Sequence, residues 1–250
     1  MTRYLCITCE VLARPIYLAA AHSPHVVDIE LMPRGLHEEV GKLQQALQDQ
    51  INRAEGRGYQ AILFGYGLCG NGTVGLRAQS IPLVIPRVHD CITLLLGDAQ
   101  RYEQEFTKIP GTYWYSQDFL ERRDISGKFS TLGPISDEHL AEQHEAFVKK
   151  YGKDNADYLM ETLCAWHTFY QRAVYIDMPS ANIENLAQQA ENEASQRGWV
   201  FEKMTGDLVL LRQLLNGNWH EGESKAYCVV PPHHVVEAAF NEMVFRCVPA

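Results

Sequence analysis

The stretch RYLCITC at residues 3–9 sets the architecture that the sequence predicts. It is short, apolar and rich in β-forming residues, as expected of a strand buried on both faces. Helix formers follow at residues 11–21, and a second strand-like run at 25–32 ends at Pro33. The clearest helix comes next, marked by apolar residues every three or four positions: Leu36, Val40, Leu43, Leu47 and Ile51. This alternation predicts parallel strands joined by right-handed crossovers.

The alternation extends through strand-like runs at residues 59–64 and 82–86, whereas helical periodicity dominates residues 136–197. The tail returns to alternation, with four expected elements: a strand at 199–204, a helix at 207–215, a strand at 226–230 and a helix at 235–245. We therefore predict one α/β domain over residues 1–250. It contains a mostly parallel sheet with helices on both faces, and a helical insertion at 136–197. Two α/β halves divided near residue 135 are the alternative.

Charge and composition exclude several classes of protein. The chain has 22 Lys and Arg against 31 Asp and Glu, a net charge of -9 that disfavours nucleic acid and anionic membranes as partners. Its longest uncharged stretch, residues 58–76, is too rich in glycine for a membrane span. The early Glu10 interrupts any signal-peptide pattern, so we expect a cytoplasmic protein whose seven cysteines are thiols.

Thiols and one imidazole follow the ends of three predicted strands. Cys9 closes the first strand, Cys69 lies in the loop after the third, and His89 and Cys91 follow the fourth. Ligands of open parallel sheets bind outside the carboxyl ends of the strands, so we expect these four side chains to meet. Sulfur and imidazole are ligands for zinc or another transition metal. A site closed by all four would be structural, and one with an open position would be catalytic.

Two residues beside these ligands are candidates for a catalytic role. Asp90 is a good helix N-cap and, with Arg87, could orient a small-molecule substrate. Cys91 would then lie in the first turn of a helix, where the dipole and free amides stabilise a thiolate. A metal-free alternative therefore uses Cys91 or Cys69 as a nucleophile with His89 as its base.

The loop after the third strand also matches a nucleotide-binding pattern. Gly65-x-Gly67-x-x-Gly70 follows a strand and resembles the dinucleotide fingerprint. Together with Gly67 and Gly70, Asn71 and Thr73 could cradle an anion if a helix begins there. Nucleotide binding is thus a second alternative.

Two further features carry weaker signals. Cys164 and His167 are spaced i, i+3 on an expected helix, so both side chains could reach one metal ion. A core helix with one solvent-exposed histidine explains them as well. The run GTYWY at residues 111–115 is an aromatic cluster that could wall a pocket. The helical insertion could instead dock a protein partner, with the chain acting as a cofactor carrier.

The loop GYGLCGNGTVGL at residues 65–76 and the run IPRVHDCIT at residues 85–93 resemble a bacterial and archaeal family of unknown function. The resemblance extends to residues 9–12, 110–114 and 206–219 and therefore covers nearly the whole chain. It implies an association with corrinoid-dependent methyl transfer, with a corrinoid as cofactor and a methyltransferase or corrinoid protein as partner.

The family pattern includes the four proposed metal ligands, but the tail of this chain departs from it. The resemblance implies a Pro-Pro-Gly turn after Val230, whereas here His233 follows the two prolines.

Overall fold

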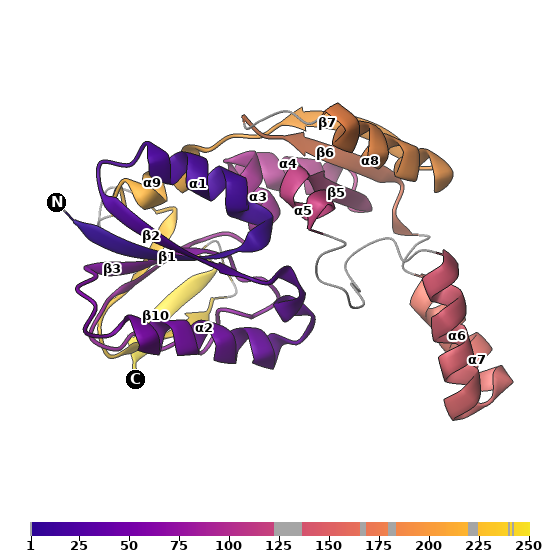
Figure 1. Ribbon diagram of the computed structural model, residues 1–250, viewed down its shortest axis with the longest axis horizontal. Helices are drawn as coiled ribbons and strands as arrows, with labels where there is room; N and C mark the ends of the chain where they lie inside the picture. Colours follow the sequence, from indigo (N-terminus) through magenta and orange to yellow (C-terminus); the bar gives the residue numbers. More distant parts are fainter. Residues whose placement is uncertain are drawn as a thin grey trace.

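The structure, a computed structural model, describes residues 2–122, 137–165, 169–179, 184–219, 225–239, 241 and 243–250. Within these residues the chain forms two main sheets and a separate hairpin (Figure 1). The larger sheet has the order β2-β1-β3-β4-β8, with these bounds: β1 Arg3–Cys9, β2 Val26–Met32, β3 Ala61–Gly65, β4 Leu83–Pro86 and β8 Tyr227–Val230. Every pairing is parallel except that of β4 with β8. The predicted α/β fold with a mostly parallel sheet is confirmed.

Helices cover both faces of this sheet. Helices α1 (Ala13–Ala21) and α9 (Val209–Leu215) lie against one face, and α2 (Val40–Ala54) lies against the other (Figure 1). Central strand β1 is buried on both faces except at Arg3, which explains its nearly continuous apolar sequence. Crossovers of this kind require apolar surface on both sides of the strands.

Three of the five residues of the predicted apolar stripe face the sheet, because Leu43, Leu47 and Ile51 are fully buried, whereas Val40 at the start of α2 is 37% exposed. The helix begins at Val40 and not at Leu36. The preceding segment Arg34–Glu38 forms the 3-10 helix η2, which directly follows Pro33. A short 3-10 helix η1 (Glu10–Leu12) similarly connects β1 to α1.

A second sheet, which the sequence did not predict, lies beside the first. It has three parallel strands in the order β5 (Thr112–Ser116), β6 (Arg172–Asp177) and β7 (Val200–Thr205). Helices α3 (Cys91–Leu96) and α4 (Ala99–Lys108) lead into it from the first sheet. Short helix α5 (Gln117–Glu121) follows β5, and α8 (Glu184–Gln196) packs on β6 and β7.

Strand β6 interrupts the segment predicted as a helical insertion, residues 136–197. The described helices there are α6 (Asp137–Tyr151), α7 (Lys153–Ala165) and α8. The second sheet also has a small core of its own, built from aromatic rings, alanines and one leucine: Tyr113, Tyr115, Leu120, Ala173, Tyr175, Ala187, Ala190, Ala194 and Trp199. The middle of the chain is therefore an α/β layer as well as a helical region.

The helix predicted at residues 235–245 is wrong, because this segment forms a hairpin of β9 (His234–Ala238) and β10 (Phe245–Pro249). Strand β9 also pairs with the loop before β4: the Leu76 carbonyl accepts from the Val236 amide, and the Gly75 amide donates to the Val236 carbonyl, both at 2.9 Å. Local periodicity cannot detect a partner so distant in sequence, and β-branched residues suit the extended form.

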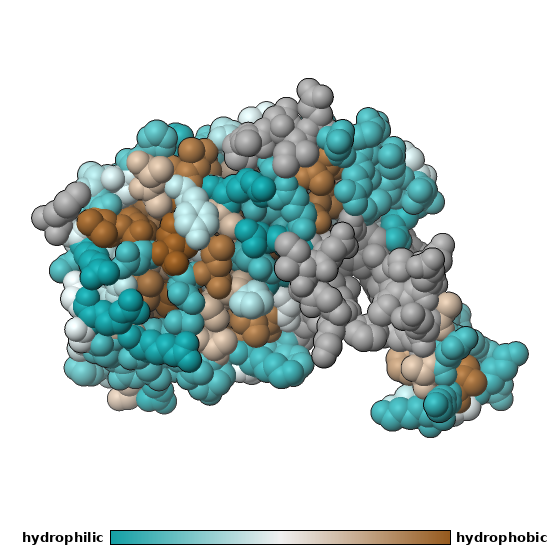
Figure 2. All heavy atoms as spheres, viewed as in Figure 1, coloured by the Kyte–Doolittle hydropathy of each residue, from teal (hydrophilic) through white to brown (hydrophobic). Residues whose placement is uncertain are grey.

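Helices α6 and α7 pack against each other and project away from both sheets (Figure 1). Hydrophilic residues cover most of α2 and α8 in the view of Figure 2. Among the described residues, no helix combines the length and apolar character needed to cross a membrane.

Candidate functional site

The loops after β3 and β4 are joined side by side at the carboxyl edge of the larger sheet. The Leu68 amide donates to the Val88 carbonyl at 2.9 Å, and the Cys69 amide donates to the His89 carbonyl at 2.8 Å. Gly67 permits this approach, because a Cβ there would lie 2.4 Å from the Val88 oxygen. Cys69 and Cys91 are thereby brought to the edge where β1 ends at Cys9.

Cys69 adopts a backbone conformation that favours glycine. Its φ is 44°, in the left-handed region, where a side chain costs about 1 kcal/mol. Glycines occur on both sides of this turn, yet a cysteine occupies the strained position. Strain of this kind concentrates at functional sites, where the side chain itself is required.

Three of the predicted ligands, Cys9, Cys69 and Cys91, form a thiol cluster. Burial, reinforced by the charge of Cys9, raises the pKa of the Cys69 thiol to about 12. Burial likewise raises the pKa of Cys9 to about 11. The pKa of Cys91 is raised by burial, then by Asp90 and by the other two thiols. In the part of the chain that is described, no three His, Cys, Asp or Glu side chains are already arranged around one metal position.

A buried phenol, Tyr66, faces this thiol cluster. Its ring is 1% exposed, and burial, followed by the charges of Cys9, Cys69 and Cys91, raises its pKa well above 10. Cys9 is a weak hydrogen-bond partner of the phenol. No group with good hydrogen-bond geometry lies near the phenol oxygen among the described residues. A buried polar oxygen with so weak a partner is uncommon in folded proteins, which makes Tyr66 a candidate member of the site.

The predicted N-cap of α3 is confirmed, because one Asp90 carboxylate oxygen accepts from the amides of Ile92 at 3.1 Å and Thr93 at 3.2 Å. The other accepts from the Tyr102 hydroxyl at 2.8 Å. The expectation of a stabilised Cys91 thiolate is wrong. Burial and the neighbouring Asp90 charge raise its pKa, so they outweigh the helix dipole.

The other two predicted residues of this run, Arg87 and His89, have surroundings that differ from those of the thiols. The Arg87 guanidinium donates to the carbonyls of Tyr227, Met243 and Phe245, so it joins β8 to the hairpin. The His89 side chain is exposed, while Cys9 is buried and the other two cysteines are half-buried. The structure thus brings three thiols together and leaves the imidazole at the surface.

The nucleotide hypothesis requires a helix to begin at the glycine-rich loop, and the loop does not lead into a helix. Turns occupy residues 69–75, and the chain continues to β4 in extended form. The Thr73 hydroxyl is buried and donates to the Gly67 carbonyl at 2.9 Å, while the Asn71 carbonyl accepts from Gln44 at 3.0 Å. Gly70 has a φ of 62° within this turn. The loop therefore lacks the helix N-terminus that binds a pyrophosphate.

The pair Cys164 and His167 cannot be placed in this site. Cys164 belongs to α7, but its side chain, like the whole of His167, lies outside the described residues.

A pocket of about 210 Å³ lies between the two sheets, next to the thiol cluster. Cys91 lines it from the larger sheet, and strand β5 lines it from the smaller one, so the aromatic run at residues 111–115 does wall a pocket. Two further residues, Arg34 and His37, line it from η2 and were not predicted from the sequence. The strand-end rule would have found both, because η2 directly follows β2.

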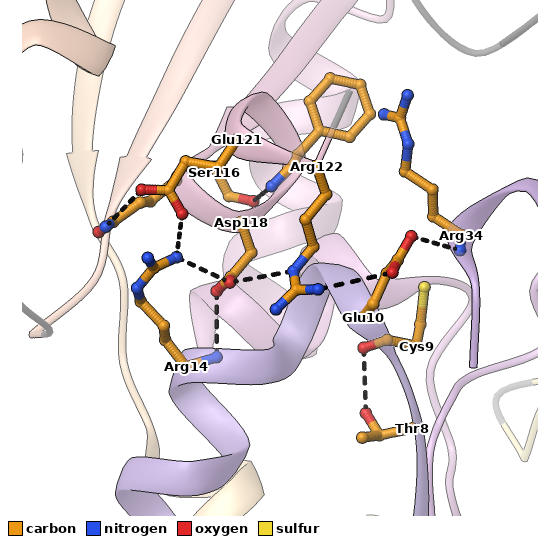
Figure 3. Close-up of polar contacts among 11 residues, drawn as sticks. Thr8, Cys9, Glu10, Arg14, Arg34, Ser116, Asp118, Glu121 and Arg122 are labelled. Atoms are coloured by element: carbon orange, nitrogen blue, oxygen red, sulfur yellow. Dashed lines mark hydrogen bonds and ion pairs between the residues drawn. The ribbon is translucent and has the colours of Figure 1, made fainter. Parts of the chain in front are cut away.

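A polar network fixes the two sides of this pocket (Figure 3). Asp118 of α5 accepts from the backbone amide of Arg14 at 3.1 Å and from its guanidinium at 3.0 Å. Glu10 accepts from the Arg34 amide at 2.9 Å and pairs with Arg122 at 3.5 Å. Burial raises the pKa of Asp118 in spite of these cations. The network connects η1, α1 and η2 to α5, so the walls are held together.

The fold and site define an α/β protein with a thiol cluster at a sheet edge and a small pocket between two sheets. The chain belongs to a family of proteins of unknown function, DUF1638, whose sequence profile matches residues 31–215. The matched region contains Cys69 and Cys91, whereas β1 with Cys9 precedes it. The comparison with curated proteins gives no match.

Proposed function

We propose that the thiol cluster Cys9, Cys69 and Cys91 binds a soft transition metal or a metallocofactor. The observation that carries this proposal is the convergence of three thiols from separate strand ends beside the buried phenol of Tyr66, whose partner among the described residues is a weak one, Cys9. Core packing requires neither the left-handed backbone at Cys69 nor a buried phenol with so weak a partner.

The donor set fits zinc, iron or copper better than magnesium or calcium, because thiolates are soft ligands. Because no three such side chains are arranged around one position among the described residues, metal binding would require the thiols to rotate about their side-chain torsions. Bound metal would also compensate the burial and mutual repulsion that keep the free thiols protonated.

Three protein ligands leave a fourth position open, and an open position is typical of catalytic metal sites. His89 is exposed, so we assign this position to solvent, a substrate or a cofactor. A metal there would supply Lewis-acid activation of a bound water or thiol. The protein's own contribution is to hold the ligands through the joined loops and to limit access of water through the aromatic pocket.

We further propose a role in one-carbon transfer, as an enzyme or an accessory protein. The family resemblance supports it, together with the place of the thiol cluster beside a pocket for a small molecule. A corrinoid is the metallocofactor, and a methyltransferase or corrinoid protein is the partner, that this role implies.

The metal-free alternative is less well supported. A nucleophilic thiol must be a thiolate, whereas burial raises the pKa of both Cys91 and Cys69. His89, the proposed base, is exposed, whereas Cys69 and Cys91 are half-buried.

Titration of the reduced, metal-free protein with Co²⁺ and Zn²⁺ tests the metal site. We expect about one equivalent of Co²⁺ to give a thiolate-to-metal charge-transfer band, and Zn²⁺ to abolish it. Cys69→Ser should weaken binding by at least about tenfold. Cys247→Ser is the matched control, because this half-buried thiol lies in β10, where it contacts the Val229 carbonyl at 3.9 Å.

Two results would contradict the proposal. One is an uptake below about a tenth of an equivalent under reducing conditions. The other is an equal loss of binding in Cys69→Ser and Cys247→Ser, since a general effect on folding would then explain both.

A further inference from the structure

We propose that Cys228 and Cys247 form a reversible disulfide that fastens the hairpin of β9 and β10 to β8, the strand at one end of the larger sheet. Neither thiol belongs to the thiol cluster, so the pair is a second reactive site. The inference does not depend on a bound metal.

The two thiols come from strands that lie against each other. Cys228 is the second residue of β8, and Cys247 is the middle residue of β10. The Cys247 Sγ contacts the Val229 carbonyl at 3.9 Å, and the Cys228 thiol is a hydrogen-bond partner of Cys247. The two sulfurs are therefore already neighbours, which is the first requirement for a disulfide without a movement of the backbone.

One cation holds these two strands together next to the thiols. The Arg87 guanidinium donates to the Tyr227 carbonyl at 3.1 Å and also to the Phe245 carbonyl. Tyr227 directly precedes Cys228, and Phe245 lies two residues before Cys247. Because both strands are fixed to one side chain, each thiol meets the other at a high effective concentration.

The two thiols differ in their access to solvent. Cys228 is 1% exposed, whereas Cys247 is half-buried. Cys247 also lines a surface hollow of about 620 Å³, together with Arg87 and Met243. Clefts of this volume admit drug-sized molecules. A low-molecular-weight disulfide therefore meets Cys247 first.

The reaction is a thiol–disulfide exchange, and its oxidant is a low-molecular-weight disulfide such as oxidised glutathione. The Cys247 thiolate attacks one glutathione sulfur, which breaks the glutathione disulfide and releases one glutathione thiolate. The Cys228 sulfur gives up its proton and attacks the Cys247 sulfur, and the second glutathione leaves with a proton. The protein pair loses two electrons and both thiol protons, and one glutathione disulfide becomes two glutathione thiols.

Cys228 becomes a better nucleophile once Cys247 has reacted. Burial raises the pKa of Cys228 to about 11, the charge of Arg87 opposes this rise, and Cys247 adds to it through its charge and its hydrogen bond. A mixed disulfide on Cys247 has neither a thiolate charge nor a thiol proton at that sulfur. The contribution of Cys247 is then removed, while Arg87 continues to favour the Cys228 thiolate.

The hairpin that this bond fastens also pairs with the residues after the glycine-rich loop. The Gly75 amide donates to the Val236 carbonyl and the Ala78 amide to the His234 carbonyl, both at 2.9 Å. A disulfide limits local opening of the segment that it closes. Oxidation of the pair therefore steadies the strand against which this loop is held.

Peptide mapping of protein oxidised in a glutathione buffer tests the inference. Reduced protein, kept free of metal by a chelator, is treated with oxidised glutathione, alkylated and digested with trypsin without reduction. Trypsin cleaves after Lys225 and Arg246, so residues 226–246 and 247–250 separate unless a disulfide joins them. We expect the joined peptides, with the mass that follows the loss of both thiol hydrogens, as the main disulfide product.

Three results of this mapping would overturn the inference. They are a bond within the thiol cluster in place of the expected one, a lasting mixed disulfide on Cys247, and thiols that all stay free in an excess of oxidised glutathione. Because the chelator excludes metal and neither thiol is a proposed ligand, the metal proposal and this inference can fail separately.

Variants separate the roles of the two thiols. Cys228→Ser should stop the reaction at the mixed disulfide of Cys247 with glutathione, and Cys247→Ser should prevent both products. Cys6→Ala is the matched control, because Cys6 is a fully buried thiol in β1 of the same sheet. It should retain the joined peptides, and their loss in this variant would argue against a specific pair.

A second measurement needs no variant and follows the hairpin itself. In the oxidised wild type, we expect the amides of Gly75 and Ala78 to exchange with solvent at least about threefold more slowly than in the reduced protein. Unchanged exchange of both amides would overturn the proposal that the disulfide fastens the hairpin.

Discussion

The two main sheets contribute different chemistry to the space between them. The five-stranded sheet brings the Cys91 thiol at its carboxyl edge and, through η2, the side chains of Arg34 and His37. The three-stranded sheet brings aromatic rings from β5, and none of its strands contains a cysteine. The two sheets therefore differ in function: one supplies reactive groups and the other supplies an apolar wall.

The two sheets also differ in how they bury charge, and this difference carries the largest expected effect on stability. Arg172 of β6 is fully buried and pairs with Glu105 at 2.6 Å and Glu202 at 2.7 Å. In the larger sheet, Arg3 pairs with Asp28 at 2.5 Å, but both side chains are more than one third exposed.

We expect Arg172→Met to lower the free energy of unfolding by about 3 kcal/mol, because it leaves two carboxylates facing each other without their cation. Arg3→Met should cost less than about 1 kcal/mol. Urea unfolding of both variants measures the contrast. Equal losses of unfolding free energy in the two variants would show that the buried ion pairs contribute no more to stability than the exposed one.

The next effect concerns the close contact that brings the thiols together. Gly67→Ala places a Cβ 2.4 Å from the Val88 carbonyl oxygen, so the loops after β3 and β4 must separate. We expect a loss of about 2 kcal/mol in unfolding free energy, accompanied by weaker Co²⁺ binding.

Gly41→Ala is the control for this variant. Gly41 lies in α2 with no atom within 4 Å of its added Cβ, so alanine should increase stability by up to about 1 kcal/mol. A tolerated Gly67→Ala with unchanged metal affinity would argue against a rigid loop pair.

A smaller effect is a loss of stability at alkaline pH, which we assign to buried thiols of the five-stranded sheet. Burial raises the pKa of Cys6 in the folded protein from 9.0 to about 12. Because the folded pKa is the higher one, its contribution is fully present below pH 9 and is lost as the pH rises from 9 towards 12.

We expect Cys6→Ala to remove about 1 kcal/mol of the stability loss that the reduced wild type shows between pH 8 and pH 10. Urea unfolding of both proteins at the two pH values measures this difference. An identical loss in the variant would assign the alkaline sensitivity to other groups.

The smallest effect concerns the turn before β9, where this chain departs from the Pro-Pro-Gly pattern. His233 has a φ of 61°, at the third position of a turn in which the His234 amide donates to the Pro231 carbonyl at 3.2 Å. Glycine is favoured at this position of such a turn.

We therefore expect His233→Gly to raise the unfolding free energy by about 0.5 kcal/mol. His234→Gly, one residue later in the extended strand, should lower it. Thermal unfolding of the two variants tests the opposite signs, and a destabilised His233→Gly would mean that the imidazole makes contacts that outweigh the strain.

The larger sheet and its edge were predictable from the amino-acid sequence alone. Strand β1 was predicted with its observed bounds, because a strand buried on both faces is a continuous apolar run that needs no knowledge of its partners. The strand-end rule placed Cys9, Cys69 and Cys91 at one edge, and the Asp90 cap was readable from local chemistry. The sequence also identified the aromatic run that walls the pocket.

The arrangement between the two sheets, in contrast, depends on long-range packing. The sequence could not show that β6 interrupts the helical middle to form a second sheet, nor that β9 pairs with residues 75–78, because these pairings join segments far apart in the chain. It could not show that Cys91 loses its expected thiolate character, since burial depends on every element that packs around it. Local periodicity records which face of an element is buried, whereas the pocket and the pKa values of its side chains depend on what each face meets.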